Sequence, residues 1–167
     1  MAMGHMHRLG RVAVALATAA VVVALVVGPA GAASPTDVRI VSHMQFNPNG
    51  PNTGDFVATG SAVDDGLICA SGSVLDTRLI FAGAQSGRGA QIPVRKTFTC
   101  DDASGTIDIQ IQVHLDFATS TETFSWVILG GTGAYARLPG SGGGSTVSDG
   151  SVPQTGNFNI YTGFLVG

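Results

Sequence analysis

Histidines, paired aspartates and hydroxyl side chains are the residues of this sequence that could do chemistry. His43 and His114 fall on the polar positions of alternating segments, and a metal site would need both of them together with a carboxylate. We expect instead that each imidazole is exposed to solvent or hydrogen-bonded. No G-x-S-x-G elbow is present, so the many serines do not predict a serine hydrolase. The sequence predicts neither a metal site nor a cofactor.

Two pairs of neighbouring carboxylates stand beside a glycine or within a turn, Asp64-Asp65 and Asp101-Asp102. Paired carboxylates can serve as a general acid and a general base, and either pair could hold Ca²⁺ loosely. Because turn residues surround both pairs, we interpret them as solvated loop residues or turn caps.

Cys69 and Cys100 are the two cysteines of the chain. No C-x-x-C motif is present, which argues against a metal site or a redox centre. Each cysteine falls in a strand-like segment of a chain that we expect to be exported, so a disulfide is predicted. Closing a loop of this length would stabilise the fold by roughly 3–4 kcal/mol in the chain-entropy model.

Residues 1–33 have the organisation of a secretory signal peptide. A positive region, an apolar run and an A-x-A cleavage site follow one another, at Arg8 and Arg11, Val12 to Val27 with Thr18 inside it, and Ala30-Gly31-Ala32. We expect cleavage near Ala33 and a secreted protein. A retained anchor is the alternative, although a run of about 16 residues is short for a bilayer span of about 20. The uncleaved leader is the one predicted link to a membrane.

The remaining residues, 34–167, have the length of a single domain. Eight Lys and Arg occur in the whole chain, and two of them, Arg8 and Arg11, lie in the leader, so six basic residues stand against eleven Asp and Glu. This part of the chain is acidic and has no basic cluster. Nucleic acid is therefore excluded as a predicted partner, because phosphate binding needs concentrated Lys and Arg.

The longest strict alternation of apolar and polar residues runs from Thr106 to Phe117. This period of two predicts a β-strand with one dry face and one wet face. A hairpin loop of residues 118–121 would place apolar residues of two strands opposite one another: Leu115 and Phe124, Val113 and Trp126, Ile111 and Ile128. Both strands then agree on the buried face, so we expect a well-specified register.

Shorter patterned segments predict further strands at 37–46, 55–59, 66–75, 78–82, 92–100, 145–148 and 157–165. The chain is thus an all-β protein of eight or nine short antiparallel strands with hairpin-length connections. A closed barrel and a two-sheet sandwich both accommodate such a set, and composition does not separate them.

Gly130, Gly131 and Gly133 predict a structural turn after the second strand of the central hairpin, with one helical turn before Pro139. Residues 131–136 also match G-x-G-x-x-A, the dinucleotide fingerprint. That fingerprint needs a full helix, and the Gly/Ser run at 140–145 leaves no room for one.

The segment 124–147, a strand followed by GGTG, an aromatic residue, a small residue and then G-x-G, resembles the signature turn of the allene oxide cyclase and dirigent barrel superfamily, which includes secreted bacterial members. The resemblance implies a closed eight-stranded barrel, with the apolar face of the central hairpin lining its interior. Enzymes of that superfamily hold a lipid or phenolic intermediate in a mostly apolar cavity. The matched turn is structural there, and no catalytic residue of the superfamily can be placed on this chain by motif.

Three functions of different classes follow from these observations. The favoured one is an exported barrel that binds a small hydrophobic molecule without transforming it, in an interior lined by Ile111, Val113, Leu115, Phe124, Trp126 and Ile128. The second is a cyclase or isomerase that steers a lipid, polyketide or phenolic intermediate. It would need an ionisable group pointing inward, for which the candidates are Asp76, Arg78, Arg95 and Asp108. The third is a filled barrel that acts through its surface, as an envelope or partner-binding module. Assembly into a homo-oligomer stays open for all three.

Overall fold

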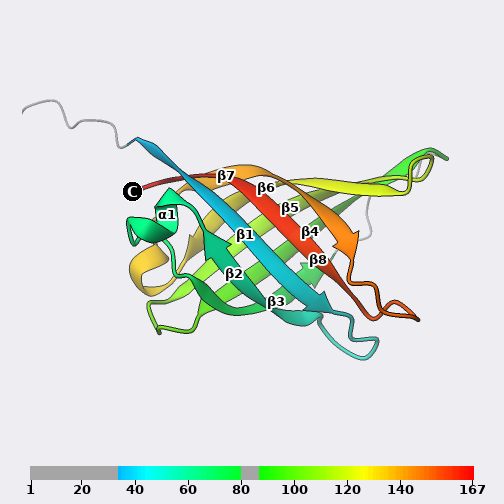
Figure 1. Ribbon diagram of the computed structural model, residues 1–167, viewed down its shortest axis with the longest axis horizontal. Helices are drawn as coiled ribbons and strands as arrows, with labels where there is room; N and C mark the ends of the chain where they lie inside the picture. The colour runs from blue at the N-terminus through cyan, green and yellow to red at the C-terminus, as the bar shows by residue number, and fades with distance from the viewer. Residues whose placement is uncertain (1–33, 80–86) are drawn as a thin grey trace, which may run out of the picture. The chain divides into compact units, whose positions relative to one another are not determined.

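The computed structural model describes residues 34–79 and 87–167. Eight antiparallel strands close into a barrel in which each strand pairs with the next in sequence and the last pairs with the first (Figure 1). The strands are β1 Pro35–Gln45, β2 Thr53–Thr59, β3 Ser71–Leu79, β4 Gly89–Cys100, β5 Thr106–Asp116, β6 Thr121–Gly131, β7 Gly140–Ser148 and β8 Gly156–Val166. The all-β closed barrel is therefore confirmed, and the sandwich is not adopted.

The predicted leader lies outside the described residues, as do residues 80–82 of the predicted fourth strand. Arg78 and Leu79, the first residues of that predicted strand, instead complete β3. Across 34–79 and 87–167, no helix is long and apolar enough to cross a membrane.

The two ends of the barrel are built differently. One end, at the left of Figure 1, carries the short helix α1, Ser61–Asp64, the turn between β4 and β5, and the 3-10 turn η1, Gly133–Tyr135. We call it the plugged end, because Ala62, Ile68 and Tyr135 from these connections are buried in the core. The opposite end, where β1 meets β2, β5 meets β6 and β7 meets β8, is called the mouth.

Aromatic side chains fill the middle of the barrel. Tyr161 on β8 is fully buried, and its ring centroid lies 5.7 Å from that of Phe98, 4.9 Å from that of Phe124 and 6.5 Å from that of Trp126. These rings make a layer between the plugged end and the mouth. Ring pairs of this kind stabilise a core beyond the area they bury.

Trp126 fits this layer because β7 is made largely of glycine where it passes the indole. A Cβ on Gly142 would lie 2.0 Å from the Thr162 carbonyl oxygen and 2.8 Å from the Trp126 ring. The indole N–H donates to the carbonyl oxygens of Gly143, at 3.1 Å, and Thr162, at 3.2 Å. The Gly/Ser run that follows residues 131–136 is therefore part of a strand, β7, whose glycines leave room for this side chain.

The predicted register of the central hairpin is wrong by two residues, although its buried face is right. From Ile109 to Asp116, each β5 residue pairs two positions earlier in β6 than predicted, as in the pairs Ile111 with Trp126, Val113 with Phe124, and Leu115 with Glu122. The loop comprises residues 117–120, because the Asp116 carboxylate caps it by accepting the backbone N–H groups of Ala118, at 2.8 Å, and Thr119, at 3.4 Å. An even shift keeps every side chain on its own face.

The third strand begins later than predicted, and Cys69 is not in it. Residues 61–68 fold as α1 and a following turn, in which the Leu67 N–H donates to the Ala62 carbonyl oxygen at 2.8 Å. β3 starts only at Ser71. The burial of Ala62 and Ile68 as part of the plug outweighs the strand-like pattern of this segment.

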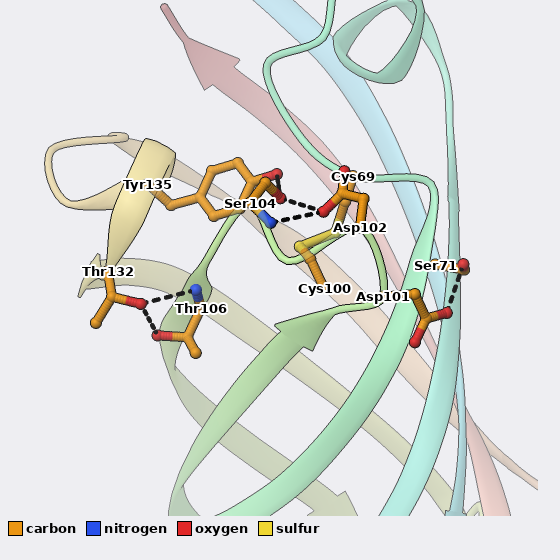
Figure 2. Close-up of a disulfide and its surroundings, with 9 residues drawn as sticks. All are labelled: Cys69, Ser71, Cys100, Asp101, Asp102, Ser104, Thr106, Thr132 and Tyr135. Carbon is orange, nitrogen blue, oxygen red and sulfur yellow. Dashed lines mark hydrogen bonds between the residues drawn. A yellow bond between two sulfur atoms is a disulfide. The ribbon is translucent and has the colours of Figure 1, made fainter.

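Cys69 and Cys100 form the predicted disulfide, with their Cα atoms 5.9 Å apart. Figure 2 shows that the bond lies beside the β4–β5 turn, in which the Asp102 carboxylate accepts the Ser104 N–H at 2.9 Å and so caps the turn. The Ser104 hydroxyl in turn lies 2.7 Å from the hydroxyl of Tyr135. The disulfide, the acidic turn and the glycine-rich turn thus form one linked structure at the plugged end.

Candidate ligand-binding cavity

A cavity of ≈ 270 Å³ opens at the mouth. Its apolar lining consists of Met44, Phe46, Leu79, Ile92, Val94, Ile111, Val113 and Phe124, and its polar lining of Asn52, Asp76, Lys96, Glu122, Thr146, Asn157 and Asn159. Apart from Phe124 of the aromatic layer, the inward strand positions of this half carry medium-sized or polar side chains. Core side chains and the plug fill the other half. The barrel is therefore packed at one end and hollow at the other.

An ion pair forms one wall of the cavity. Asp76 on β3 and Lys96 on β4 occupy paired positions, and Lys96 Nζ lies 2.5 Å from Asp76 Oδ1. The side-chain amide of Asn52 donates to Asp76 Oδ2 at 3.0 Å. The two charged residues are only 8% and 6% exposed. Removing two charges from water is costly even when they are paired, so such a pair inside a cavity indicates a functional site.

A β-bulge at Thr77 determines which β3 side chains reach this wall. The pairing of β3 with β4 shifts between Asp76 and Arg78. The extra residue lets Asp76 and Leu79 both point into the cavity, while Arg78 points outward. A bulge commonly redirects side chains in this way.

Three side chains on adjacent strands form a second polar wall. Glu122 on β6 pairs with Thr146 on β7, which pairs with Asn159 on β8. The Thr146 Oγ1 atom lies 2.6 Å from Glu122 Oε1 and 2.9 Å from Asn159 Oδ1. Asn159 in turn pairs with Ser42 on β1, which is fully buried. These residues make a band of hydrogen-bonding groups around one side of the interior.

A wider hollow of ≈ 560 Å³ lies next to the cavity at the mouth. The two spaces share Phe46, Glu122, Thr146 and Asn157. Glu122 therefore stands at the boundary between them. Phe117, which lines the hollow, is 53% exposed, so the entrance has apolar as well as polar surface.

The predicted ligand-lining residues divide between cavity and core. Ile111, Val113 and Phe124 line the cavity, and Leu115 lines the outer hollow. Trp126 belongs to the aromatic layer and Ile128 is buried in the core, and neither of them lines the cavity. Alternation placed all six on the inner face but said nothing about depth along the barrel.

Of the four ionisable candidates for the interior, only Asp76 points inward. Arg78, Arg95 and Asp108 lie exposed on the outer face, where Arg95 Nε–H donates to Gln110 Oε1 at 3.2 Å and the Thr97 hydroxyl donates to Asp108 at 2.6 Å. The expectation that these three candidates could reach the interior was therefore wrong.

Sequence reasoning missed Lys96 and Glu122. Each of the two residues takes a position in its strand that the alternation otherwise gives to apolar residues. The inward positions are Ile92, Val94, Lys96 and Phe98 on β4, and Glu122, Phe124 and Trp126 on β6. A charged residue in phase with an apolar set is the pattern that could have found them.

His43 and His114 take no part in this site. His43 stacks on Phe158 with ring centroids 4.6 Å apart, and its Nε2 lies 3.6 Å from the Asp149 carboxylate. Hydrogen bonds from Ser151, with a smaller effect of His43, hold the pKa of Asp149 below its ordinary value. Within 34–79 and 87–167, no three His, Cys, Asp or Glu side chains are grouped to hold a metal ion.

Tyr161 forms part of the layer beneath the cavity and stays protonated there. Burial raises the pKa of its phenol, and the negative charges of Asp76 and Glu122 add to the rise. The phenol is thus a neutral group under a charged cavity.

Fold and site together define a closed eight-stranded antiparallel barrel with a half-polar cavity at one end. No family model, curated protein or solved structure matches the chain.

Proposed function

We propose that this protein is an exported barrel of the allene oxide cyclase and dirigent type that binds a small, largely apolar molecule in its mouth cavity without transforming it. The observation that carries the proposal is the half-filled interior. At the mouth, inward-facing side chains that include apolar ones line an open space of ≈ 270 Å³ and do not fill it. Small-molecule sites are typically concave, mostly apolar and supplied with a few polar groups. The disulfide supports export, because such bonds persist in oxidising compartments.

A filling variant tests whether this cavity is the site. Val94→Phe adds a ring inside the cavity, and Val127→Phe makes the same change on the outer face, where Val127 is exposed. The neutral dye prodan should bind the wild type and Val127→Phe with a blue shift in its emission, and should bind Val94→Phe at least about tenfold more weakly. Circular dichroism checks that both variants are folded. Equal dye binding by the two variants would contradict the proposal.

An isomerase or cyclase is the second candidate, and the Asp76–Lys96 pair favours it. A carboxylate and an ammonium group at the wall of this cavity can accept protons from a bound intermediate and donate protons to it. Mass spectrometry of recovered ligands separates the two functions. A carrier returns its ligand unchanged, whereas an isomerase returns a rearranged product that disappears in Asp76→Asn.

The surface-acting module is not carried forward, since a filled barrel was its expected feature and this barrel is hollow at the mouth.

A further inference from the structure

The charged side chains of the cavity do not balance. Asp76, Lys96 and Glu122 are its ionisable lining residues. Asp76 and Lys96 neutralise each other at 2.5 Å. Glu122 has no Lys, Arg or His within ion-pair distance among the residues that the structure describes. The lining therefore carries one net negative charge, and that charge is on Glu122.

The Glu122 carboxylate also has unused capacity to accept hydrogen bonds. Its partner in the described part of the chain is the Thr146 hydroxyl, at 2.6 Å. A hydroxyl has a single proton, so Thr146 supplies at most one hydrogen bond to this carboxylate, whichever way the neighbouring Asn159 amide is turned. An ionised carboxylate can accept about four. The remaining capacity lies at the boundary between the cavity and the outer hollow.

Apolar residues lie one step further in from Glu122. Phe124 is the next inward residue of β6, and it pairs with Val113 of β5. Both line the cavity, and Glu122 lines both the cavity and the hollow. A molecule that enters with its apolar end first would thus place a polar head group beside Glu122 and its body against Phe124 and Val113.

Resting on the proposed function, we infer that the ligand of this cavity is a small apolar amine whose ammonium group is held by Glu122. An ammonium group donates charge-assisted hydrogen bonds, which are stronger than those of a neutral donor. It also compensates the part-buried negative charge that the protein leaves unpaired. A carboxylate or phosphate head group would meet a like charge in the same place, which disfavours it.

Three probes of matched shape test the inference: phenethylamine, phenethyl alcohol and hydrocinnamate share a phenyl ring on a short chain and differ in the charge of the head group. Binding to the folded protein is measured by calorimetry at neutral pH and low salt. We expect the amine to bind most tightly, the alcohol about tenfold more weakly, which corresponds to about 1.4 kcal/mol, and the acid most weakly.

Glu122→Gln should remove the advantage of the amine over the alcohol while leaving the affinity for the alcohol unchanged. The matched control is Asp108→Asn, which removes one negative charge from the outer face and should leave amine binding within about twofold. Acid binding as tight as amine binding, or an amine affinity that survives in Glu122→Gln, would overturn the inference and leave a cavity ligand of another class. If none of the three probes binds, the amine inference fails, and the prodan experiment decides whether the proposed function fails with it.

Discussion

The Asp76–Lys96 ion pair lies in the barrel interior, where apolar side chains would be enough to form a core. Both side chains are almost fully buried, and the carboxylate is held by Lys96 on one oxygen and by Asn52 on the other. Such pairs contribute little net stability, because the cost of desolvation offsets the attraction of the charges. The pair is thus better explained by what it offers to a bound molecule than by folding.

Removing one partner of this pair should be far more damaging than removing both. Lys96→Met leaves the Asp76 charge buried with Asn52 as its remaining partner, and should lower the free energy of unfolding by about 3 kcal/mol. Urea denaturation measures the change. The double variant Asp76→Leu/Lys96→Met should recover most of the loss. Equal stability of Lys96→Met and wild type would show that water reaches Asp76 freely.

Tyr161 leads to a prediction at alkaline pH. Burial raises the pKa of its phenol above the ordinary value of about 10. The native phenol keeps its proton where the unfolded one loses it, so its contribution to stability is full below about pH 10 and is lost as the pH rises beyond it. Urea denaturation should show a falling free energy of unfolding above about pH 10.

Tyr161→Phe is the control for this loss of stability at alkaline pH. In this variant the free energy of unfolding should fall less above about pH 10. At neutral pH the substitution should change the free energy of unfolding by less than about 0.5 kcal/mol. The reason is that the Tyr161 hydroxyl, although buried, completes no hydrogen bond within the described residues. A large loss at neutral pH would instead reveal a hydrogen bond to this hydroxyl in solution.

Among the secondary-structure elements, the β6–β7 turn that carries the sequence resemblance lies at the plugged end, away from the cavity. The Ala134 N–H donates to the Ser104 carbonyl oxygen at 2.9 Å, which ties this turn to the β4–β5 turn. Thr106 and Thr132 add a further link between the same two segments, with their hydroxyl oxygens 3.0 Å apart (Figure 2). The glycines of the β6–β7 turn therefore allow it to pack closely against the β4–β5 turn.

Gly133→Ala should be more destabilising than the same change at Gly150. Both glycines have positive φ, 59° and 81°. A Cβ on Gly133 would lie 2.2 Å from the Ser104 carbonyl oxygen, whereas one on Gly150 would meet nothing within 4 Å. We expect a cost of about 1–2 kcal/mol for Gly150→Ala, from backbone strain alone, and a larger cost for Gly133→Ala. Urea denaturation measures both.

Prodan binding should be unchanged in folded Gly133→Ala. A variant that kept full stability but lost the dye would make the turn part of the binding site and would contradict its structural role.

At the scale of the whole molecule, one covalent link joins elements that the barrel brings together. Cys69 precedes β3 and Cys100 ends β4, 31 positions later. The bond lies at the plugged end, so it braces the packed half of the barrel and leaves the mouth without a covalent constraint.

Loss of this disulfide should lower the free energy of unfolding by about 3–4 kcal/mol in the chain-entropy model. Urea denaturation of Cys69→Ser/Cys100→Ser measures the loss. Trp126 emission reports it, since this side chain is 3% exposed and should emit blue-shifted light when native. A reductant should destabilise the wild type and leave the double variant unchanged. Two titratable thiols in the native protein would contradict the bond.

Local patterning was enough to predict several features of this protein. Alternation along residues 106–117 identified the inner face of β5, and two lone cysteines permitted only one intrachain disulfide. The inner face was predictable because the side-chain period of a strand is set by the backbone of that strand alone. The disulfide was predictable because each cysteine has no other cysteine in the chain as a partner.

Features that depend on how strands meet needed the tertiary structure. The Asp116 cap moved the hairpin register by two residues, and the bulge at Thr77 turned Arg78 outward while Asp76 stayed inside. Lys96 acquired its role only when β4 paired with β3 and placed it against Asp76. Alternation assigns a side chain to a face, but its depth in the barrel and its neighbours on other strands come from register and closure, which are long-range properties of the folded chain.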